Sequence, residues 1–307
     1  MDGNVRDLLT LRSLSGDEIM AIIERGVDIK KNPAAYEGSL KGTNLLMLFQ
    51  KTSTRTRLSF ELGIQELGGR AIVMDWTKSN FAISPIRYEA MYVARHVHLI
   101  MARLVKHADL VALAEASPVP VINGCCERYH PTQALADLMT IYEKAGTLRG
   151  VTLAYIGIHN NVANSLVAGA IRVGMNLILV TPERNEASWD IALAEEAEKS
   201  GLVRVTKDPA ALKEADFVYT DTWVDMENFY NPAYAEEKER RLRVMMPYQL
   251  RPELLGGRDP YIMHDMPIHP GLEIAHSLIE SPKSIIFDQA ENRLHAQKSL
   301  MLYLLGK

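Results

Sequence analysis

Short apolar runs alternate with helical patterns in two successive series, and this alternation restricts the fold more than any other feature of the chain. A short apolar run bounded by turn residues is typical of a strand that is buried on both faces, and an intervening helix lets neighbouring strands run parallel. The two series predict strands at residues 44–49, 71–74, 99–102 and 120–122, then at 151–156, 177–180, 203–205, 217–219, 261–263 and 285–287. The sequence therefore predicts an α/β fold with two doubly wound parallel-sheet domains.

Helical patterns connect these strands and close the chain. Ser15 and Glu18 form a capping box ahead of an apolar stripe, which predicts a first helix at 16–31. Further helices are predicted at 58–67, 84–97, 107–116, 131–145, 161–173, 188–199, 233–246 and 290–305. Because the strand–helix pattern restarts after 146–150, we expect a first domain at 1–145, a second domain at 146–289, and a C-terminal helix at 290–307 that returns to the first domain.

Composition disfavours several classes of partner and cofactor. A chain of 307 residues with 47% apolar residues and a net charge of -4 gives no reason to expect nucleic acid or a membrane as a partner. The two cysteines, Cys125 and Cys126, are adjacent, which disfavours a disulfide and fits a reducing, cytoplasmic location. His96, His98 and His107 lack metal-ligand spacing, and no G-x-G-x-x-G sequence follows a strand, so we expect neither a metal nor another cofactor.

The segment from Lys51 to Arg57 lies at a predicted strand-to-helix junction and is rich in groups that bind anions. Unpaired backbone N–H groups point out of a helix start, and the helix dipole favours negative charge there. Ser53 and the neighbouring threonines add hydroxyl donors, and the planar guanidinium of arginine matches a phosphate or carboxylate. The alternative is an ordinary N-capped helix with solvated basic side chains. We favour a phosphate site.

Polar residues also follow the other strands of the first series. Arg103 directly follows the strand at 99–102, and His130 and Gln133 stand three residues apart at the start of a helix, where both can face one ligand. In doubly wound sheets, ligands bind beyond the carboxyl ends of the strands. A lone histidine is more often structural than catalytic. Because Arg103, Arg55 and Arg57 are expected at the same sheet edge, we favour a functional role for His130.

Two of these segments resemble the signatures of the aspartate/ornithine carbamoyltransferase family, and the resemblance runs over nearly the whole chain. Residues 53–57 read STRTR, and residues 130–133 read HPTQ, which matches the family's H-P-x-Q motif. The resemblance implies that Ser53, Thr54, Arg55, Thr56 and Arg57 hold the phosphate of carbamoyl phosphate. It further implies that Thr56, Arg103 and His130 contact the carbonyl oxygen of carbamoyl phosphate and that Gln133 contacts its amino group. Arg293, in the AENR segment near the end of the chain, is also implied to contact carbamoyl phosphate.

The second half resembles the ornithine branch of the family more than the aspartate branch. Its segments G-x-x-N-N, D-T-W-x-x-M and H-x-M-P are similar to segments that bind the amino acid in ornithine enzymes. The resemblance implies that Asn161 holds the carboxylate of the acceptor, that Asp221 binds its α-ammonium, and that Met226 and Met266 line the pocket.

The chain also departs from the family pattern. Asp225 stands where the ornithine branch has serine, Asp265 stands where it has cysteine, and the 75–85 loop lacks the sequence by which the family closes its site. Two added carboxylates near the amine pocket favour a cationic acceptor, and Asp265 becomes a candidate catalytic residue that orients the reacting ammonium. Alternatively, Asp225 and Asp265 replace serine and cysteine without changing the specificity.

The resemblance implies transfer of a carbamoyl group from carbamoyl phosphate to ornithine or an ornithine-like amine, which gives citrulline or an analogue and phosphate. Lysine, putrescine and aspartate remain alternative acceptors, and a catalytically silent protein that binds carbamoyl phosphate as a regulator is an alternative of another class. The family resemblance also implies a homotrimer or a multiple of trimers, in which the 75–85 loop reaches towards a neighbouring subunit.

Overall fold

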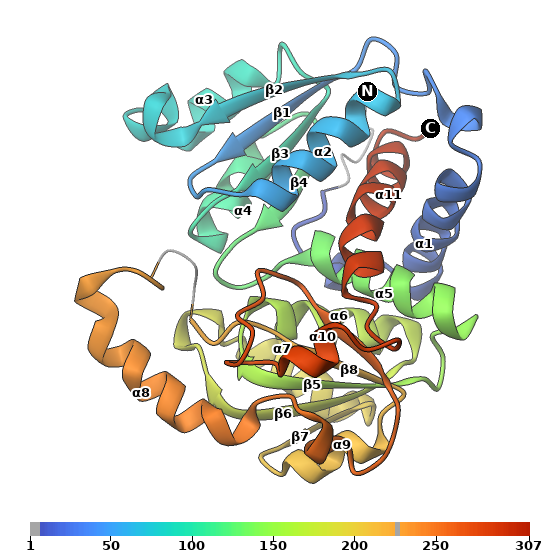
Figure 1. Cartoon of the computed structure of the whole chain (residues 1–307). Coiled ribbons are helices and arrows are strands. Elements are labelled where there is room, and N and C mark those ends of the chain that lie inside the picture. Colours follow the sequence, from blue (N-terminus) through green and yellow to red (C-terminus); the bar gives the residue numbers. More distant parts are fainter. Residues whose placement is uncertain (1–6, 225–227) are drawn as a thin grey trace.

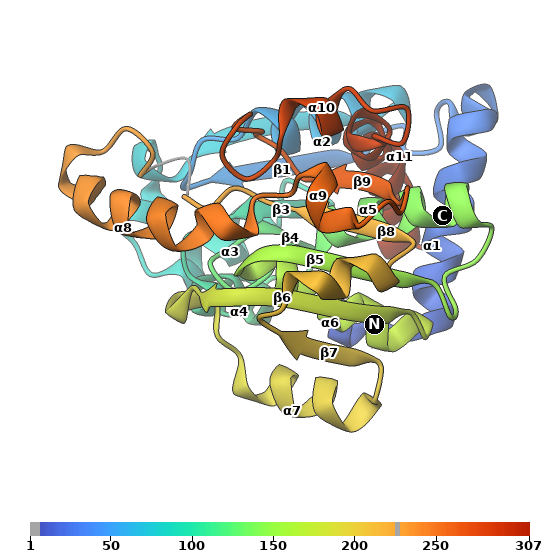
Figure 2. The same ribbon diagram turned by 60° about the horizontal axis from the view of Figure 1, so that its bottom comes forward.

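The computed structural model describes residues 7–224 and 228–307, and these residues form two parallel sheets (Figure 1). The first sheet has the order β2-β1-β3-β4 and contains β1 (Asn44–Phe49), β2 (Arg70–Asp75), β3 (Leu99–Arg103) and β4 (Val121–Cys125). The second has the order β7-β6-β5-β8-β9, which can be followed in Figure 2, and contains β5 (Thr152–His159), β6 (Asn176–Arg184), β7 (Val203–Thr206), β8 (Phe217–Thr220) and β9 (Tyr261–His264). The predicted α/β fold with two parallel sheets is confirmed.

Helices cover the sheets and join them. They are α1 (Gly16–Lys31), α2 (Thr54–Glu66), α3 (Ile86–Val93), α4 (His107–Ala116), α5 (Pro131–Ala145), α6 (Asn161–Val173), α7 (Ile191–Ser200), α8 (Ala235–Met245), α9 (Pro252–Leu255), α10 (His276–Ile279) and α11 (Ile286–Leu304). The predicted capping box is present, because the Ser15 side chain accepts the Glu18 N–H while the Glu18 carboxylate accepts the Ser15 N–H. At the other end of the first series, α5 stops at Gly146, which adopts the left-handed conformation that glycine tolerates best.

One predicted strand, at 285–287, is wrong. Ser284 forms only an isolated bridge with Ile262, and helix α11 begins at Ile286. The buried Ile286 is followed by Phe287, a residue that is 65% exposed, as expected for the first turn of a helix with one apolar face. A short apolar run has no periodicity that separates a strand from the start of a buried helix, and length alone misled the prediction.

The C-terminal helix α11 returns to the first half of the chain, as predicted, and packs against α1, α2 and α5 (Figure 1). The contact includes buried polar bonds: Asn292 donates to Thr140 (2.9 Å) and Glu143 (2.6 Å), and Ser299 donates to the Ile22 carbonyl (2.7 Å). The main apolar core is continuous from the first sheet through α5, α6 and α11 to the inner face of the second sheet. This shared core fixes the two sheets relative to each other.

Within the described residues, no helix has both the length and the apolar character that a membrane span requires.

Candidate active site

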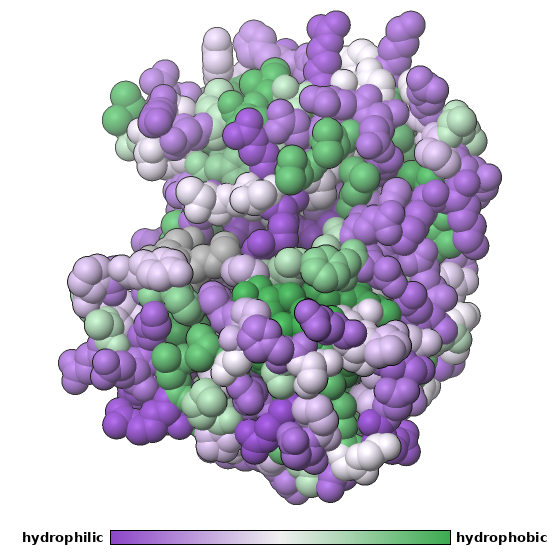
Figure 3. Space-filling view, in the orientation of Figure 1, coloured by the Kyte–Doolittle hydropathy of each residue, from purple (hydrophilic) through white to green (hydrophobic). Residues whose placement is uncertain are grey.

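The carboxyl ends of strands from both sheets surround a cavity of about 310 Å³. Figure 3 shows the surface hollowed between the upper part of the molecule, with the first sheet, and the lower part, with the second. Ten of the predicted site residues line this cavity: Ser53, Arg55, Thr56, Arg103, His130, Asn161, Asp221, Asp265, Met266 and Arg293. They come from segments up to 240 residues apart in the sequence, and the fold brings them to one cavity.

Thr56 is the centre of the first group. Ser53 caps helix α2 by accepting the Thr56 N–H (3.3 Å), and both side chains line the cavity. The fully buried Thr56 hydroxyl accepts hydrogen bonds from Arg103 (3.3 Å) and from Arg293 (2.8 Å). Because its oxygen already accepts from two guanidinium groups, the hydroxyl has its own proton left to donate to a ligand.

Three arginines converge at this end of the cavity. Burial, together with Arg103 and Arg55, lowers the pKa of Arg293 to about 10, and burial also lowers the pKa of Arg55. The Nε atoms of Arg103 and Arg293 are buried and have no hydrogen-bond partner among the described residues. Like charges held together with unused donors form a site for an anion with several oxygens.

His130 is buried beside these arginines. Burial, Arg293, Arg103 and Arg55 all disfavour the charged ring, so the pKa of His130 lies well below its usual value and the imidazole is neutral at neutral pH. Its backbone N–H donates to the Ser165 hydroxyl (2.7 Å), which fixes the start of α5 against α6. A neutral imidazole in the cavity wall can donate one hydrogen bond without adding another positive charge.

Three predicted residues do not line the cavity. Arg57 is exposed on the outer face of α2 and pairs with Glu61 (2.9 Å), and Thr54 is exposed at the first position of α2. Gln133 is buried behind the cavity wall, where its Nε2 donates to Asp137 (2.9 Å) and its Oε1 has no partner among the described residues.

The opposite end of the cavity belongs to the second sheet and is acidic. Asp221 follows β8 and accepts hydrogen bonds from Asn160 (2.5 Å) and from the Thr222 N–H (2.6 Å). Asn161 begins α6 and donates to the Cys126 carbonyl (2.7 Å), which ties the end of the second sheet to the end of the first. The predicted residues Asp225 and Met226 lie outside the described part of the chain.

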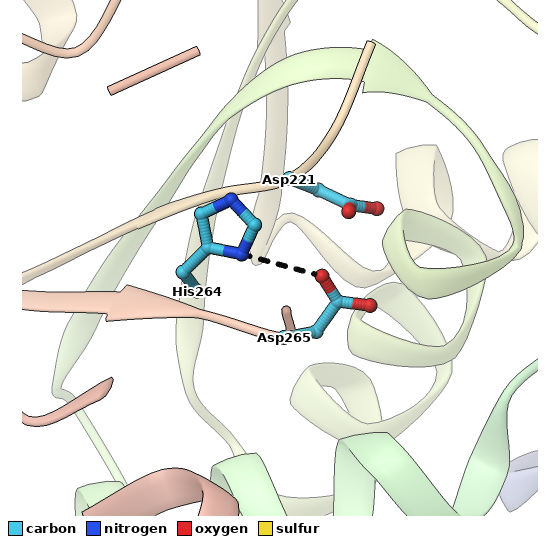
Figure 4. A group of neighbouring side chains, drawn as sticks. All are labelled: Asp221, His264 and Asp265. Atoms are coloured by element: carbon cyan, nitrogen blue, oxygen red, sulfur yellow. Dashed lines mark ion pairs between the residues drawn. The ribbon is translucent and has the colours of Figure 1, made fainter. Parts of the chain in front are cut away.

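Asp265 lies beside Asp221 at the end of β9 (Figure 4). Burial and the negative charge of Asp221 raise the pKa of Asp265 well above its usual value. Together with His264, the two carboxyl groups have ligand atoms within 4.8 Å of one another, a spacing that a metal ion could use. The ring of His264 is not available for this role, because Nδ1 accepts the Met266 N–H (2.8 Å) and Nε2 therefore carries the proton and donates to Glu273 (3.1 Å).

Some cavity residues were not among the predicted ones. Asn160, Cys125 and Thr222 line the cavity beside the predicted residues, as does Lys51 from the start of the predicted anion-binding segment. Each follows or ends a strand, so the rule that polar groups at strand ends face the ligand would have found them. A larger cavity of about 740 Å³ lies along α7 and the ends of β6 and β7, but no predicted site residue lines it.

Comparison with known proteins gives consistent matches over the full length. Residues 6–143 match the family model "Aspartate/ornithine carbamoyltransferase, carbamoyl-P binding domain", and residues 149–304 match "Aspartate/ornithine carbamoyltransferase, Asp/Orn binding domain". The ornithine carbamoyltransferase of Archaeoglobus fulgidus is 41% identical, with 99% of this chain and 98% of that protein aligned. The ornithine carbamoyltransferase of Bacillus thuringiensis is 40% identical over 98% of this chain and 95% of that protein.

Solved structures agree with these sequence matches. The ornithine carbamoyltransferase from Pyrococcus furiosus superposes with a TM-score of 0.89 at 39% identity, with 98% of this chain and 97% of that chain covered. The enzyme of the same name from Thermus thermophilus gives a TM-score of 0.84 at 35% identity, with 97% and 98% covered.

Proposed function

The chain belongs to the aspartate/ornithine carbamoyltransferase family, and on this premise we propose that it transfers the carbamoyl group of carbamoyl phosphate to the side-chain amine of ornithine, giving citrulline and phosphate. The observation that carries the proposal is a single cavity with two oppositely charged ends, one with three arginines and one with two carboxyl groups. A dianionic phosphate suits the first end, and a cationic amino acid suits the second.

The first end of the cavity binds carbamoyl phosphate in this proposal. Arg55, the N–H groups at the start of α2 and the hydroxyls of Ser53 and Thr56 hold the phosphate, and Arg293 adds a further guanidinium. Thr54 contributes its backbone N–H. The side chain of Arg57 is turned outward, so Arg57 contributes only through its place in the first turn of α2. Residues 1–145 then form the carbamoyl-phosphate domain, 146–289 form the acceptor domain, and helix 290–307 supplies Arg293.

Chemistry at the carbamoyl carbon needs stabilisation of a developing oxyanion. Arg103, His130 and the Thr56 hydroxyl line the cavity and are the donors for this role, and the hydrogen bond between Arg103 and Thr56 holds these two in position before the reaction begins. The Gln133 Oε1, buried without a partner among the described residues, is an acceptor for the carbamoyl amino group. Positioning of both substrates supplies much of the remaining acceleration.

The acidic end binds ornithine. Asp221 pairs with the α-ammonium and Asn161 with the carboxylate, while Met266 contributes apolar surface next to the aliphatic chain. Asp225 and Met226, which lie outside the described residues, complete this pocket. Asp265 lies between the acceptor and the arginines and meets the reacting amine.

The test of this function is the formation of a ureido product from carbamoyl phosphate with ornithine, lysine, putrescine and aspartate supplied separately. We expect citrulline from ornithine and little product from aspartate, whose second carboxylate would face Asp221 and Asp265. If only lysine or putrescine gave a product, that amine would be the acceptor in place of ornithine. Binding of carbamoyl phosphate without product from any amine would show a silent binding protein instead.

We further propose that the protein assembles as a homotrimer or a multiple of trimers. Large apolar side chains are exposed on α2, β2, α3 and the loop before α3, all on the first-sheet half: Leu58, Leu62, Ile72, Val73, Ile83, Tyr88, Met91 and Tyr92. A strand of a parallel sheet is normally covered on both faces, and so large an exposed apolar surface is typical of an interface. The 75–85 loop adjoins this surface, and its Lys78 side chain is 83% exposed, so it is available to a neighbouring site.

A reducing, cytoplasmic location completes the proposal. Cys125 and Cys126 are both buried free thiols, and burial raises the pKa of Cys126 to about 12, which keeps it protonated and unreactive.

A further inference from the structure

We propose that Asp265 and Asp221 hold one proton between them in the free site, and that Asp265 takes the proton which the acceptor's reacting ammonium must lose. The inference rests on the carbamoyl transfer proposed above and assigns a chemical step to a carboxyl group that stands where the ornithine branch of the family has cysteine. The two carboxyl groups lie in different hydrogen-bonding environments.

Both carboxyl oxygens of Asp221 already accept a hydrogen bond. Its Oδ2 accepts one from Asn160 (2.5 Å), and its Oδ1 accepts another from the Thr222 N–H (2.6 Å). In Asp265, by contrast, the Oδ1 atom is buried and has no hydrogen-bond partner among the described residues. A proton shared by the pair therefore resides on Asp265, which can donate it to Asp221.

The neighbouring histidine cannot replace Asp265 as the proton carrier. His264 Nδ1 lies 3.6 Å from Asp265 Oδ1, the separation marked in Figure 4, but its lone pair accepts the Met266 N–H. The proton on Nε2 points away from the cavity towards Glu273 (3.1 Å), whose Oε1 also accepts the His269 N–H. Both ring nitrogens of His264 are thereby engaged by partners other than Asp265.

Charges around Asp265 place it between the two substrates. The carboxyl group of Asp265 counteracts the lowering of the pKa of both Arg55 and Arg293, and all three side chains line the same cavity. Charged and titratable groups of α2, α5, α11 and β5 and at or near the ends of β8 and β9 face Asp265. They are Arg55, Asp137, Arg293, Tyr155, Tyr219, Asp221 and His264. Burial and Asp221 outweigh the attraction of Arg55, so the pKa of Asp265 lies well above its usual value.

Over one turnover, the protons that the pair loses and gains are equal in number. Binding of a cationic acceptor brings a positive charge next to the pair, and the shared proton leaves to water, so that an Asp265 carboxylate faces the ammonium. One ammonium proton then moves to Asp265 while the nitrogen lone pair forms a bond to the carbamoyl carbon. The bond from this carbon to the phosphate oxygen breaks, the phosphate leaves with the electron pair, and it accepts the second proton of the nitrogen. The pair ends the reaction with one proton, as it began.

Proton release on binding is the signature of this arrangement. We would measure ornithine binding by calorimetry in buffers of different ionisation enthalpy at pH 7, with inorganic phosphate present to occupy the arginine cluster. We expect close to one proton released per ornithine bound, and close to none for norvaline, which has the same chain without the side-chain amine. Asp265→Asn should abolish the release with ornithine, and Asp259→Asn, the same change at an exposed carboxylate before β9, should leave it unchanged.

Turnover provides the second measurement. Asp265→Asn should lower kcat by at least about 100-fold, the range for loss of a proton acceptor, and the rate that remains should rise with pH as more amine becomes neutral. Phosphate binding to Asp265→Asn should stay as tight as in the unaltered protein, since a merely misfolded cavity would lose it.

The two proposals fail differently. An unaltered protein that makes no ureido product with any amine overturns the proposed function. An unaltered protein that makes citrulline, while Asp265→Asn releases the same proton on binding and keeps the same pH profile, overturns the role of Asp265 alone.

Discussion

Asp137 shows how single buried residues hold the site in place. Its Oδ1 accepts one hydrogen bond from Gln133 (2.9 Å) and one from Gln289 (2.7 Å), and the Gln289 Oε1 accepts the His264 N–H (2.9 Å). One carboxyl group thus links α5, α11 and the end of β9. The bond to Gln133 Nε2 also fixes the orientation of that amide and leaves Oε1 as the acceptor for a ligand.

The first prediction concerns the stability of this buried group. Burial raises the pKa of Asp137 from 3.8 to about 7, so the folded protein binds this proton more tightly than the unfolded chain does. Its contribution is fully present below about pH 4 and is lost as the pH rises towards 7. Between pH 5 and pH 8 the unaltered protein should lose about 3 kcal/mol more unfolding free energy than Asp137→Asn, measured by urea denaturation. Parallel pH dependences for the two proteins would contradict the account.

The sequence predicted many of the cavity residues because strand ends meet at one edge of a parallel sheet. It overstated the basic segment: successive helical residues lie about 100° apart, so Arg55 and Arg57, two positions apart on α2, cannot both face the cavity. That separation was foreseeable from helix geometry. The unpartnered Oε1 of Gln133 was not, because it depends on Asp137 within the folded core.

At the scale of elements, α11 is the part that the sequence described least well. Its first turn was predicted to be a strand, and its helical pattern does not show which of its residues reach the cavity. In the folded chain α11 brings Arg293 within 2.8 Å of Thr56, from 237 positions away. Contacts between such distant residues leave no periodic signal, so only resemblance to a family pointed to Arg293.

The second prediction tests the anchoring of α11. Asn292 is fully buried, and its amide receives a hydrogen bond from Lys30 (2.8 Å) besides the two that it donates to α5. Asn292→Ala leaves these partners unsatisfied and should lower the free energy of unfolding by about 2–4 kcal/mol in urea titrations. Phe287→Ala, on the exposed side of the same helix, should change it by less than about 0.5 kcal/mol. Equal effects of the two substitutions would show that α11 is not held by this network.

At the scale of the whole molecule, function depends on two sheets whose strand ends face one cavity. The sequence predicted both sheets from alternation alone. It could not predict how they face each other, because this arrangement rests on the continuous apolar core and on buried bonds between distant helices. Nor did any apolar pattern reveal that β2 leaves Ile72 and Val73 exposed at the sheet edge.

The third prediction concerns assembly through that edge. Ile72→Asp puts a charge into the proposed interface and should shift the mass measured by light scattering from a trimer towards a single chain. Val205→Asp, the matched change on exposed edge strand β7 of the second sheet, should leave the mass unaltered. A single-chain mass for the unaltered protein would overturn the proposed interface.

The most direct measurement follows label from carbamoyl phosphate, carried in its carbamoyl carbon, into citrulline in the presence of ornithine. We expect labelled citrulline from the unaltered protein and from Arg204→Ala, which removes an exposed arginine of β7. We expect a loss of at least about 100-fold in Arg55→Ala, whose side chain lines the cavity, with an unchanged fold by circular dichroism. No label in citrulline from the unaltered protein would contradict the proposed reaction, and full activity of Arg55→Ala would contradict its assignment to this cavity.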